Sequence, residues 1–251
     1  MAAVRDHGRP RVDHLSRLRA PRALGVDEHS FLAATTEHPT LLVTGFVDLD
    51  RHRLLDMVEA RTAQGVSDSL AARPAPWLAA IGTVTLDPYA GHARGLAEGL
   101  PHARVVVDHF HAVRLANGAL DEVRRRVMQE TLGHRCRMGD PLHRIRRQLL
   151  LAHERLDRGW ARIQAGLAAG DPAGEVGVGV AYLTKELLRG VYATTSERRA
   201  RRRLGRFCAH CRTADVVDLR RLASMVRRWE HEVLGWHPTG LSNGPTEAMN
   251  L

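Results

Sequence analysis

The sequence predicts an α/β fold in which a mixed β-sheet is interrupted by a large all-helical insertion. Short β-branched runs alternate with short helical segments as far as residue 107. In contrast, residues 111–234 carry an apolar residue every three or four positions, which is the helical period. After this block, a Ser-Asn-Gly turn leads to a last acidic residue, Glu247. We therefore expect the chain to leave the sheet, form a helical block and then return.

The first strands are predicted to begin within residues 22–58. Apolar runs occur at residues 22–26, 40–49 and 53–60. The D-L-D-R-H segment between the last two runs has the composition of a hairpin turn. Residues 1–21 are polar and arginine-rich without a clear period, and we interpret them as a loose lead-in.

Helices and strands then alternate. Residues 65–72 predict a short helix that ends at the Pro74/Pro76 stretch, and residues 77–86 predict a buried strand. Residues 89–100 have helical spacing, and residues 103–107 form a short β-branched run. The order β-β-β-α-β-α-β predicts a sheet with a meander at one side and crossovers at the other.

The helical insertion is predicted from residues 113–128, 143–156, 180–192 and 216–234, with a glycine-rich break at residues 170–179. The predicted organisation is a lead-in (1–21), a sheet core (22–112), a helical insertion (113–237) and a return segment (238–251).

Composition points to an anionic partner. The net charge is +9, and Lys185 is the only lysine, so nearly all of the positive charge is arginine. Arginine suits bidentate phosphate contact, although a GC-rich genome would give the same bias. No apolar run is long enough to span a membrane, and the first twenty residues lack the apolar core of a secretory signal. We expect a protein of the bacterial cytoplasm whose partner is DNA.

Three acidic residues follow apolar runs where strands are expected to end. Asp27 closes R-A-L-G-V, Asp87 closes I-G-T-V-T-L, and Glu247 follows the Ser-Asn-Gly turn. Three carboxylates gathered on a sheet can hold two Mg²⁺ or Mn²⁺ ions for phosphodiester chemistry. Each of them taken alone is equally consistent with a polar turn at the end of a strand.

Four segments carry a family resemblance: V-D-E-H-S, V-T-L-D-P-Y, L-P-H-A-R-V-V-V-D-H-F-H-A-V and L-S-N-G-P-T-E-A-M-N. Together they resemble the ISL-three family of bacterial insertion-sequence transposases, from about residue 24 to the end of the chain. The resemblance implies an RNase H-like DDE catalytic domain with a helical insertion before the glutamate. It makes Asp27, Asp87 and Glu247 the catalytic and metal-binding triad, and Asp108 and His111 an accessory motif.

Strand order decides which acidic residues can act together. In an RNase H-like sheet the first strand lies beside the fourth, and neighbouring strands are about 5 Å apart. Asp27 and Asp87 would then be adjacent, whereas Asp108 after the fifth strand would lie about 10 Å from Asp27. We therefore predict Asp87 as the second metal ligand. Asp108 and His111 are equally explained by capping and packing of the helix that follows.

The run from Glu197 to Arg206 has too few acidic residues to pair all of its arginines. We predict that this run follows a DNA backbone through Arg198, Arg199, Arg201, Arg202, Arg203 and Arg206. The nearby pair Cys208 and Cys211 is half of a zinc site. We expect these residues to be ordinary unpaired cysteines and not zinc ligands.

Two departures from the family bear on activity. Family members carry an N-terminal zinc-binding and helix-turn-helix region and continue past the glutamate with a basic helix. By that comparison we expect a transposase truncated at both ends, impaired or inactive as this chain. An RNase H-like nuclease or resolvase and a non-catalytic DNA-binding remnant stay open as alternatives, as does a homo-oligomer.

Overall fold

The computed structural model describes residues 18–37, 39–59, 62–171 and 177–249, apart from the side chains of Glu247 and Met249. Most of the predicted lead-in (1–17) and the centre of the glycine-rich break (172–176) lie outside the described residues. The chain divides into two compact units. Unit 1 combines Met1–Asp108 with Leu241–Leu251, and unit 2 is His109–Gly240.

Unit 1 is built on a five-stranded mixed sheet whose strand order is β3-β2-β1-β4-β5. Its strands are β1 (Ala23–Leu32), β2 (Leu41–Asp48), β3 (Arg53–Val58), β4 (Thr83–Leu86) and β5 (Arg104–Val107). The first three strands pair antiparallel, whereas β4 is parallel to β1 and β5 is parallel to β4. This confirms the predicted meander on one side, the crossovers on the other, and the placement of the first strand beside the fourth.

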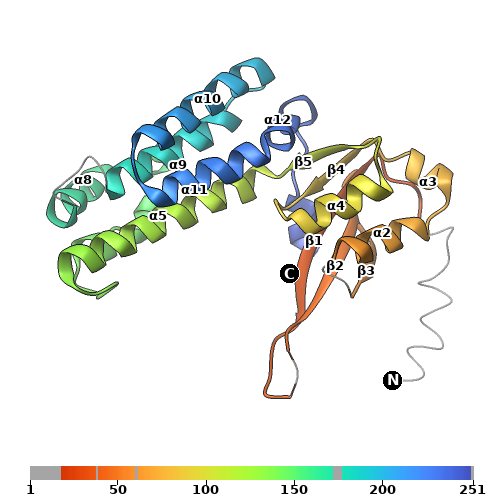
Figure 1. Cartoon of the computed structure of the whole chain (residues 1–251), viewed down its shortest axis with the longest axis horizontal. Helices are drawn as coiled ribbons and strands as arrows, with labels where there is room; N and C mark the ends of the chain where they lie inside the picture. The colour runs from red at the N-terminus through yellow and green to blue at the C-terminus, as the bar shows by residue number, and fades with distance from the viewer. Residues whose placement is uncertain (1–17, 38, 60–61, 172–176, 250–251) are drawn as a thin grey trace. The chain divides into compact units, whose positions relative to one another are not determined.

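The described residues of unit 1 also form the helices α2 (Ala63–Ala71), α3 (Ala75–Ala79), α4 (Ala90–Gly99) and α13 (Gly244–Met249). Figure 1 shows α2 and α4 over one face of the sheet. Gly95 lets these two helices approach closely, because a Cβ there would lie 2.4 Å from the Ala63 carbonyl oxygen. Nε2 of His92 on α4 lies 3.2 Å from the Thr44 hydroxyl, which ties α4 to β2.

The predicted strand at residues 77–86 is wrong in its first half. A short helix, α3, starts after Pro74, which has an extended backbone, and contains Pro76 in its first turn. Proline fits the first turn of a helix because the missing amide hydrogen has no helical partner there. Trp77 and Ile81 are both buried, so the apolar run does pack into the core. Only Thr83–Leu86 pairs as a strand.

Unit 2 is all-helical within its described residues, 109–171 and 177–240. Its elements are α5 (His109–Leu132), α6 (Pro141–Arg144), α7 (Arg146–Leu150), η2 (His153–Arg155), α8 (Gly159–Gly170), α9 (Val178–Tyr192), α10 (Glu197–Thr213), α11 (Val217–Arg228) and α12 (Glu230–Thr239). The four long helices α5, α9, α10 and α11 pack as a closed ring of neighbours, α5 on α9, α9 on α10, α10 on α11 and α11 on α5. Across the described part of the chain, no helix is both long and apolar enough to cross a membrane.

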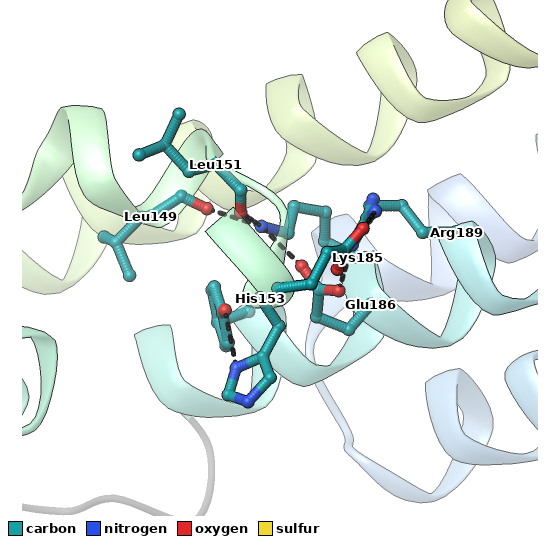
Figure 2. Close-up of polar contacts among 8 residues, drawn as sticks. Leu149, Leu151, His153, Lys185, Glu186 and Arg189 are labelled. Atoms are coloured by element: carbon teal, nitrogen blue, oxygen red, sulfur yellow. Dashed lines mark hydrogen bonds and ion pairs between the residues drawn. The ribbon is translucent and has the colours of Figure 1, made fainter. Parts of the chain in front are cut away.

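The single helix predicted at residues 143–156 is broken into α6, α7 and η2, and the buried Lys185 explains the second break. Its ammonium group donates to the carbonyl oxygens of Leu149 at 2.8 Å and Leu151 at 2.5 Å (Figure 2). These carbonyls lie where α7 ends, so a side chain from α9 replaces the backbone donors of a continued helix. Burial lowers the pKa of Lys185, while the Glu186 carboxylate, 2.8 Å away, opposes that shift.

The long helix predicted at residues 216–234 is also broken, at Trp229. This residue has φ −105° and ψ 21°, outside the helical region, and its amide donates to the Val226 carbonyl at 3.2 Å. The carbonyl of Trp229 then accepts from Val233 at 2.8 Å, which starts α12. Trp229, Val233 and Leu234 are all buried, so the chain packs into the core of unit 2 at the break and after it, which favours this geometry.

Candidate active site

The strand register brings Asp27 and Asp87 to the same level of two adjacent strands. In the parallel pair of β1 and β4, Val26 lies opposite Leu86, the last residue of β4. Asp27 and Asp87 are the next residues along each chain, and adjacent strands are about 5 Å apart. Two acidic residues therefore lie side by side where the β1–β4 pairing ends.

Both residues belong to the face of the sheet that α13 covers. Successive side chains along a strand point to opposite faces, so Asp27 shares its face with Gly25 and Asp87 continues the face of Thr85. Gly25 and Thr85 both contact the segment that begins α13. Glu247 is part of α13, so the three acidic residues come from elements that meet on one face.

The predicted strand end at Asp27 is wrong, because Asp27 lies inside β1. The strand continues to Leu32, since its other edge stays paired with β2 as far as Leu41. Asp27 is 7% exposed, and its Oδ1 accepts a hydrogen bond from the Glu28 amide at 2.8 Å. Asp27 is therefore paired with Gly45 of β2, whereas Asp87 follows the last residue of β4.

Asn243 joins the two acid-bearing strands. Its side chain is fully buried, with 0% exposure. Its Oδ1 accepts a hydrogen bond from the Thr85 hydroxyl at 3.0 Å, and its Nδ2 donates to the Val26 carbonyl at 3.4 Å. Val26 directly precedes Asp27, and Thr85 is two residues before Asp87. One side chain thus fixes the return segment against both strands beside their acidic residues.

Gly25 sets how closely α13 approaches the sheet. A Cβ at this position would lie 2.1 Å from the Thr246 hydroxyl, 2.9 Å from a Leu49 methyl group and 3.1 Å from Asn243 Oδ1. Only a residue without a side chain fits there. The Thr246 amide donates to the Asn243 carbonyl at 2.9 Å, so the turn that leads into Glu247 is closed by the chain itself.

The structure places the backbone of Glu247 in α13, and its side chain lies outside the described residues. What is fixed is the route of the chain: Asn243 and Thr246 hold the helix that carries Glu247 on the same face as Asp27 and Asp87.

Asp108 lies at the same level on the next strand. Val107 ends β5 opposite Leu86, so Asp108 is beside Asp87 and two strands from Asp27. Its amide donates to the Leu86 carbonyl at 3.3 Å, and the residue is buried. Asp108 directly precedes α5, and His111 is a buried residue in the first turn of that helix. The strand order thus agrees with the predicted separation of Asp108 from Asp27.

The chemistry of the donor set suits Mg²⁺ or Mn²⁺. Asp27 and Asp87 offer carboxylate oxygens, the ligands that hard divalent cations prefer. Among the described side chains, no three histidines, cysteines or acidic residues are gathered closely enough to hold a metal. The side chain of Glu247, the third acidic residue of the predicted set, does not belong to those described.

The predicted DNA-contacting arginines lie on α10 of unit 2. The exposed ones are Arg198, Arg199, Arg201, Arg202 and Arg206. Arg201 forms ion pairs with Glu197 at 2.9 Å and Glu230 at 3.4 Å. Arg203 is half-buried, and its Nη1 donates to the carbonyls of Gly190 and Ala193 at the end of α9. Arg203 therefore has a local structural role, and its predicted contact with DNA stays a prediction.

Cys208 and Cys211 lie on the buried side of α10, whereas Cys136 is exposed. Burial raises the pKa of the Cys211 thiol to about 12 and also raises that of Cys208. Both thiols are thus protonated at neutral pH and occupy apolar surroundings.

The sequence reading missed Asn243, Thr85 and Gly25 as residues that build the site. Ser-Asn-Gly was visible only as a turn, and Gly25 only as part of an apolar run. A buried asparagine in such a turn signals that its amide has partners elsewhere, because a buried amide is rarely left without hydrogen bonds. The partners themselves are 158 and 217 residues away in the chain, where no local pattern identifies them.

Comparison with known proteins gives one result. A protein-family model described as Transposase, of the DDE type, matches residues 24–251. No curated protein and no solved structure matches the chain.

Proposed function

The chain belongs to the ISL-three family of transposases, and from that premise we propose that unit 1 is an RNase H-like catalytic domain that cuts and joins DNA strands. The proposed reaction is metal-dependent cleavage at a phosphodiester, followed by transfer of the exposed 3′-hydroxyl to a second strand. Asp27, Asp87 and Glu247 are the proposed catalytic residues.

The observation that carries this proposal is that the two strands bearing acidic residues, β1 and β4, both contact the same return segment. Asp27 and Asp87 are in register on parallel strands, and Asn243 hydrogen-bonds beside both of them four residues before Glu247. A structural role alone does not require acidic residues at these positions. The strand order β3-β2-β1-β4-β5, with only the first three strands antiparallel, further supports an RNase H-like arrangement.

The proposed roles follow from the donor set. Asp27 lies in the continuous strand β1 and would supply the fixed carboxylate, whereas Asp87 and Glu247 would bind from the end of β4 and from α13. Two Mg²⁺ or Mn²⁺ ions held by these residues would activate the attacking oxygen and stabilise the leaving oxygen in an in-line displacement. Asn243 is a positioning residue in this scheme, since it acts through the backbone of Val26 and through Thr85.

DNA is the partner that the family implies, and we assign phosphate contact to the exposed arginines of α10. Arg198, Arg199, Arg202 and Arg206 have no ion-pair partner among the residues that the structure describes. Unpaired guanidinium groups on one helix are suited to a phosphate backbone. Arg201 and Arg203 were predicted to take part and remain in the proposal, although both also have partners within unit 2.

A nicking assay tests the proposal. The 251-residue chain is incubated with supercoiled plasmid and Mn²⁺ or Mg²⁺, and open-circle DNA is measured over time. Nicking that is lost in Asp27→Asn, Asp87→Asn and Glu247→Gln, and in EDTA, supports the proposal. Glu98→Gln is the matched control, because it removes an exposed carboxylate of α4 whose ion-pair partner is Arg94.

A labelled oligonucleotide with a free 3′-hydroxyl separates a transposase from a simple nuclease. Joining of this oligonucleotide to plasmid by the wild type supports transposition chemistry. Nicking without joining would favour the nuclease alternative. Equal nicking by all the variants would rule out this site.

A further inference from the structure

We propose that the exposed face of α11, which packs beside α10, is a second binding surface for the phosphate backbone of duplex DNA. The proposal rests on the proposed function only in taking DNA as the partner. Neither the sequence pattern nor the family match assigns a role to α11.

The two sides of α11 differ sharply. Leu219, Leu222, Ala223 and Val226 are buried against the rest of unit 2. The opposite side carries Arg220, Arg221, Ser224, Arg227 and Arg228, all of them exposed.

Few acidic residues neutralise this side. Arg220 pairs with Asp215 at 2.9 Å, and Arg126 of α5 uses Asp218 at 3.3 Å. Within the described residues, Arg221, Arg227 and Arg228 have no ion-pair partner. Acidic residues do stand at helical spacing from Arg221 and Arg227, but they pair elsewhere: Asp218 with Arg126 and Glu230 with Arg201.

The exposed side is also hollowed. A shallow groove of about 430 Å³ is lined by Val217, Arg220, Arg221, Ser224, Met225 and Arg228. Arg221 and Arg228 are seven residues apart, which places their Cα atoms about 10 Å apart along the helix. Three nucleotides of one DNA strand advance by about the same length. Two guanidinium groups at this spacing can contact phosphates of one strand, with the Ser224 hydroxyl between them.

The arginine-bearing helix α10 is the neighbour of α11. The two helices pack against each other and are joined by a short turn. Unpaired guanidinium groups are therefore present on two helices of the same unit.

Salt-dependent DNA binding tests the α11 surface without requiring catalysis. Binding of a fluorescein-labelled 20-base-pair duplex to the full-length protein is measured by anisotropy in EDTA, between 50 and 300 mM KCl. The variant is Arg221→Gln/Arg228→Gln. Losing two phosphate contacts should reduce the slope of log K against log salt by about 1.8 and weaken binding about 30-fold at 0.15 M salt.

The matched control is Arg53→Gln/Arg104→Gln, which removes the same charge from exposed residues at the opposite end of the sheet from Asp27 and Asp87. This control should keep a slope close to that of the wild type. Both double variants should have the melting temperature of the wild type, because the substituted side chains are exposed. Thermal melting checks that they are folded.

The outcomes separate this proposal from the proposed function. If Arg198→Gln/Arg202→Gln lowers the slope and Arg221→Gln/Arg228→Gln does not, the α11 surface is only solvated and this proposal is overturned alone. If the two α11 substitutions abolish binding of poly-glutamate but leave DNA binding unchanged, the surface binds an acidic protein, which also overturns it. Absence of DNA binding by the wild type would contradict both proposals.

Discussion

The side-chain amide of Asn243 hydrogen-bonds to the two strands that bear Asp27 and Asp87. Its partners are the Thr85 hydroxyl and the Val26 carbonyl, and all three groups are buried. In a buried site, removing one partner of a hydrogen bond costs more folding free energy than the bond itself contributes. The remaining polar group then has neither water nor another partner.

Asn243→Leu is therefore expected to destabilise the protein by about 2–4 kcal/mol, since a buried hydroxyl and a buried carbonyl lose their partner. Thr85→Val in the same chain removes the orphaned hydroxyl, so the double variant should be more stable than the sum of the single effects by about 1 kcal/mol. Urea unfolding of the four proteins measures this coupling. Strictly additive effects would show that the Thr85–Asn243 bond contributes nothing. Plasmid nicking should fall in both Asn243 variants, because α13 loses its anchor.

At the scale of elements, the short helix α13 is held in place by its close packing on β1. A helix of six residues is too short to be stable by itself, so its position depends on the sheet beneath it. The contact at Gly25 supplies that position.

Gly25→Ala should destabilise the protein by about 1–3 kcal/mol, because the new methyl group would displace Thr246 and Leu49. Gly118→Ala in α5 is the control: nothing lies within 4 Å of its added Cβ, and alanine should stabilise a mid-helix position by roughly 0.5–1 kcal/mol. Thermal melts compare the two. A Gly25→Ala protein as stable as the wild type would show that α13 does not pack on β1 as described.

The junction of η2 and α9 predicts a response to acid. Hydrogen bonding to Arg189, whose guanidinium lies 2.5 Å from the Glu154 carboxylate, lowers the pKa of Glu154 from 4.5 to about 2. A lowered folded-state pKa stabilises the fold above pH 4.5, and this contribution is lost as the pH falls through about 2.

Glu154→Gln should therefore be less stable than the wild type at pH 7, and the difference should shrink between pH 4.5 and pH 2. Because Glu154 is mostly exposed, 0.5 M salt should also shrink the difference at pH 7. Melting temperatures of both proteins at pH 7, 4.5 and 2 measure the effect. A difference that stays constant with pH would contradict the assigned role of the Glu154–Arg189 pair.

Secondary structure was predictable where one period ran unbroken and failed where a distant side chain or a kink intervened. The strands β2, β3 and β5 and the helix α9 follow directly from local patterns, whereas β1 extends beyond its predicted end at Asp27 because it stays paired with β2. Residues 143–156 keep a helical period, yet Lys185, a residue of α9, binds the carbonyls at Leu149 and Leu151 and ends the helix. No pattern within residues 143–156 contains that information.

At the scale of the whole molecule, unit 1 is discontinuous: the chain leaves it after Asp108 and returns at Leu241. The sequence indicated this path. Asp87 follows a strand-like pattern and Glu247 follows a long helical block, and the two can belong to one site only if the chain returns to the sheet. It could not show how the return is fixed. The contacts of Asn243 and Gly25 join residues that the helical unit separates in the sequence. They depend on the fit of side chains, which no periodic pattern reveals.

Metal binding by the full-length protein tests the central claim most directly, because it needs no knowledge of the DNA sequence that the protein cuts. Free Mn²⁺ is titrated by electron paramagnetic resonance for the wild type, Asp27→Asn, Asp87→Asn, Glu247→Gln and Asp108→Asn. We predict that the wild type and Asp108→Asn bind Mn²⁺ alike, and that each of the other variants loses affinity while remaining folded by circular dichroism. Binding that survives in Asp27→Asn and Asp87→Asn, or that is lost only in Asp108→Asn, would contradict the assignment of the site.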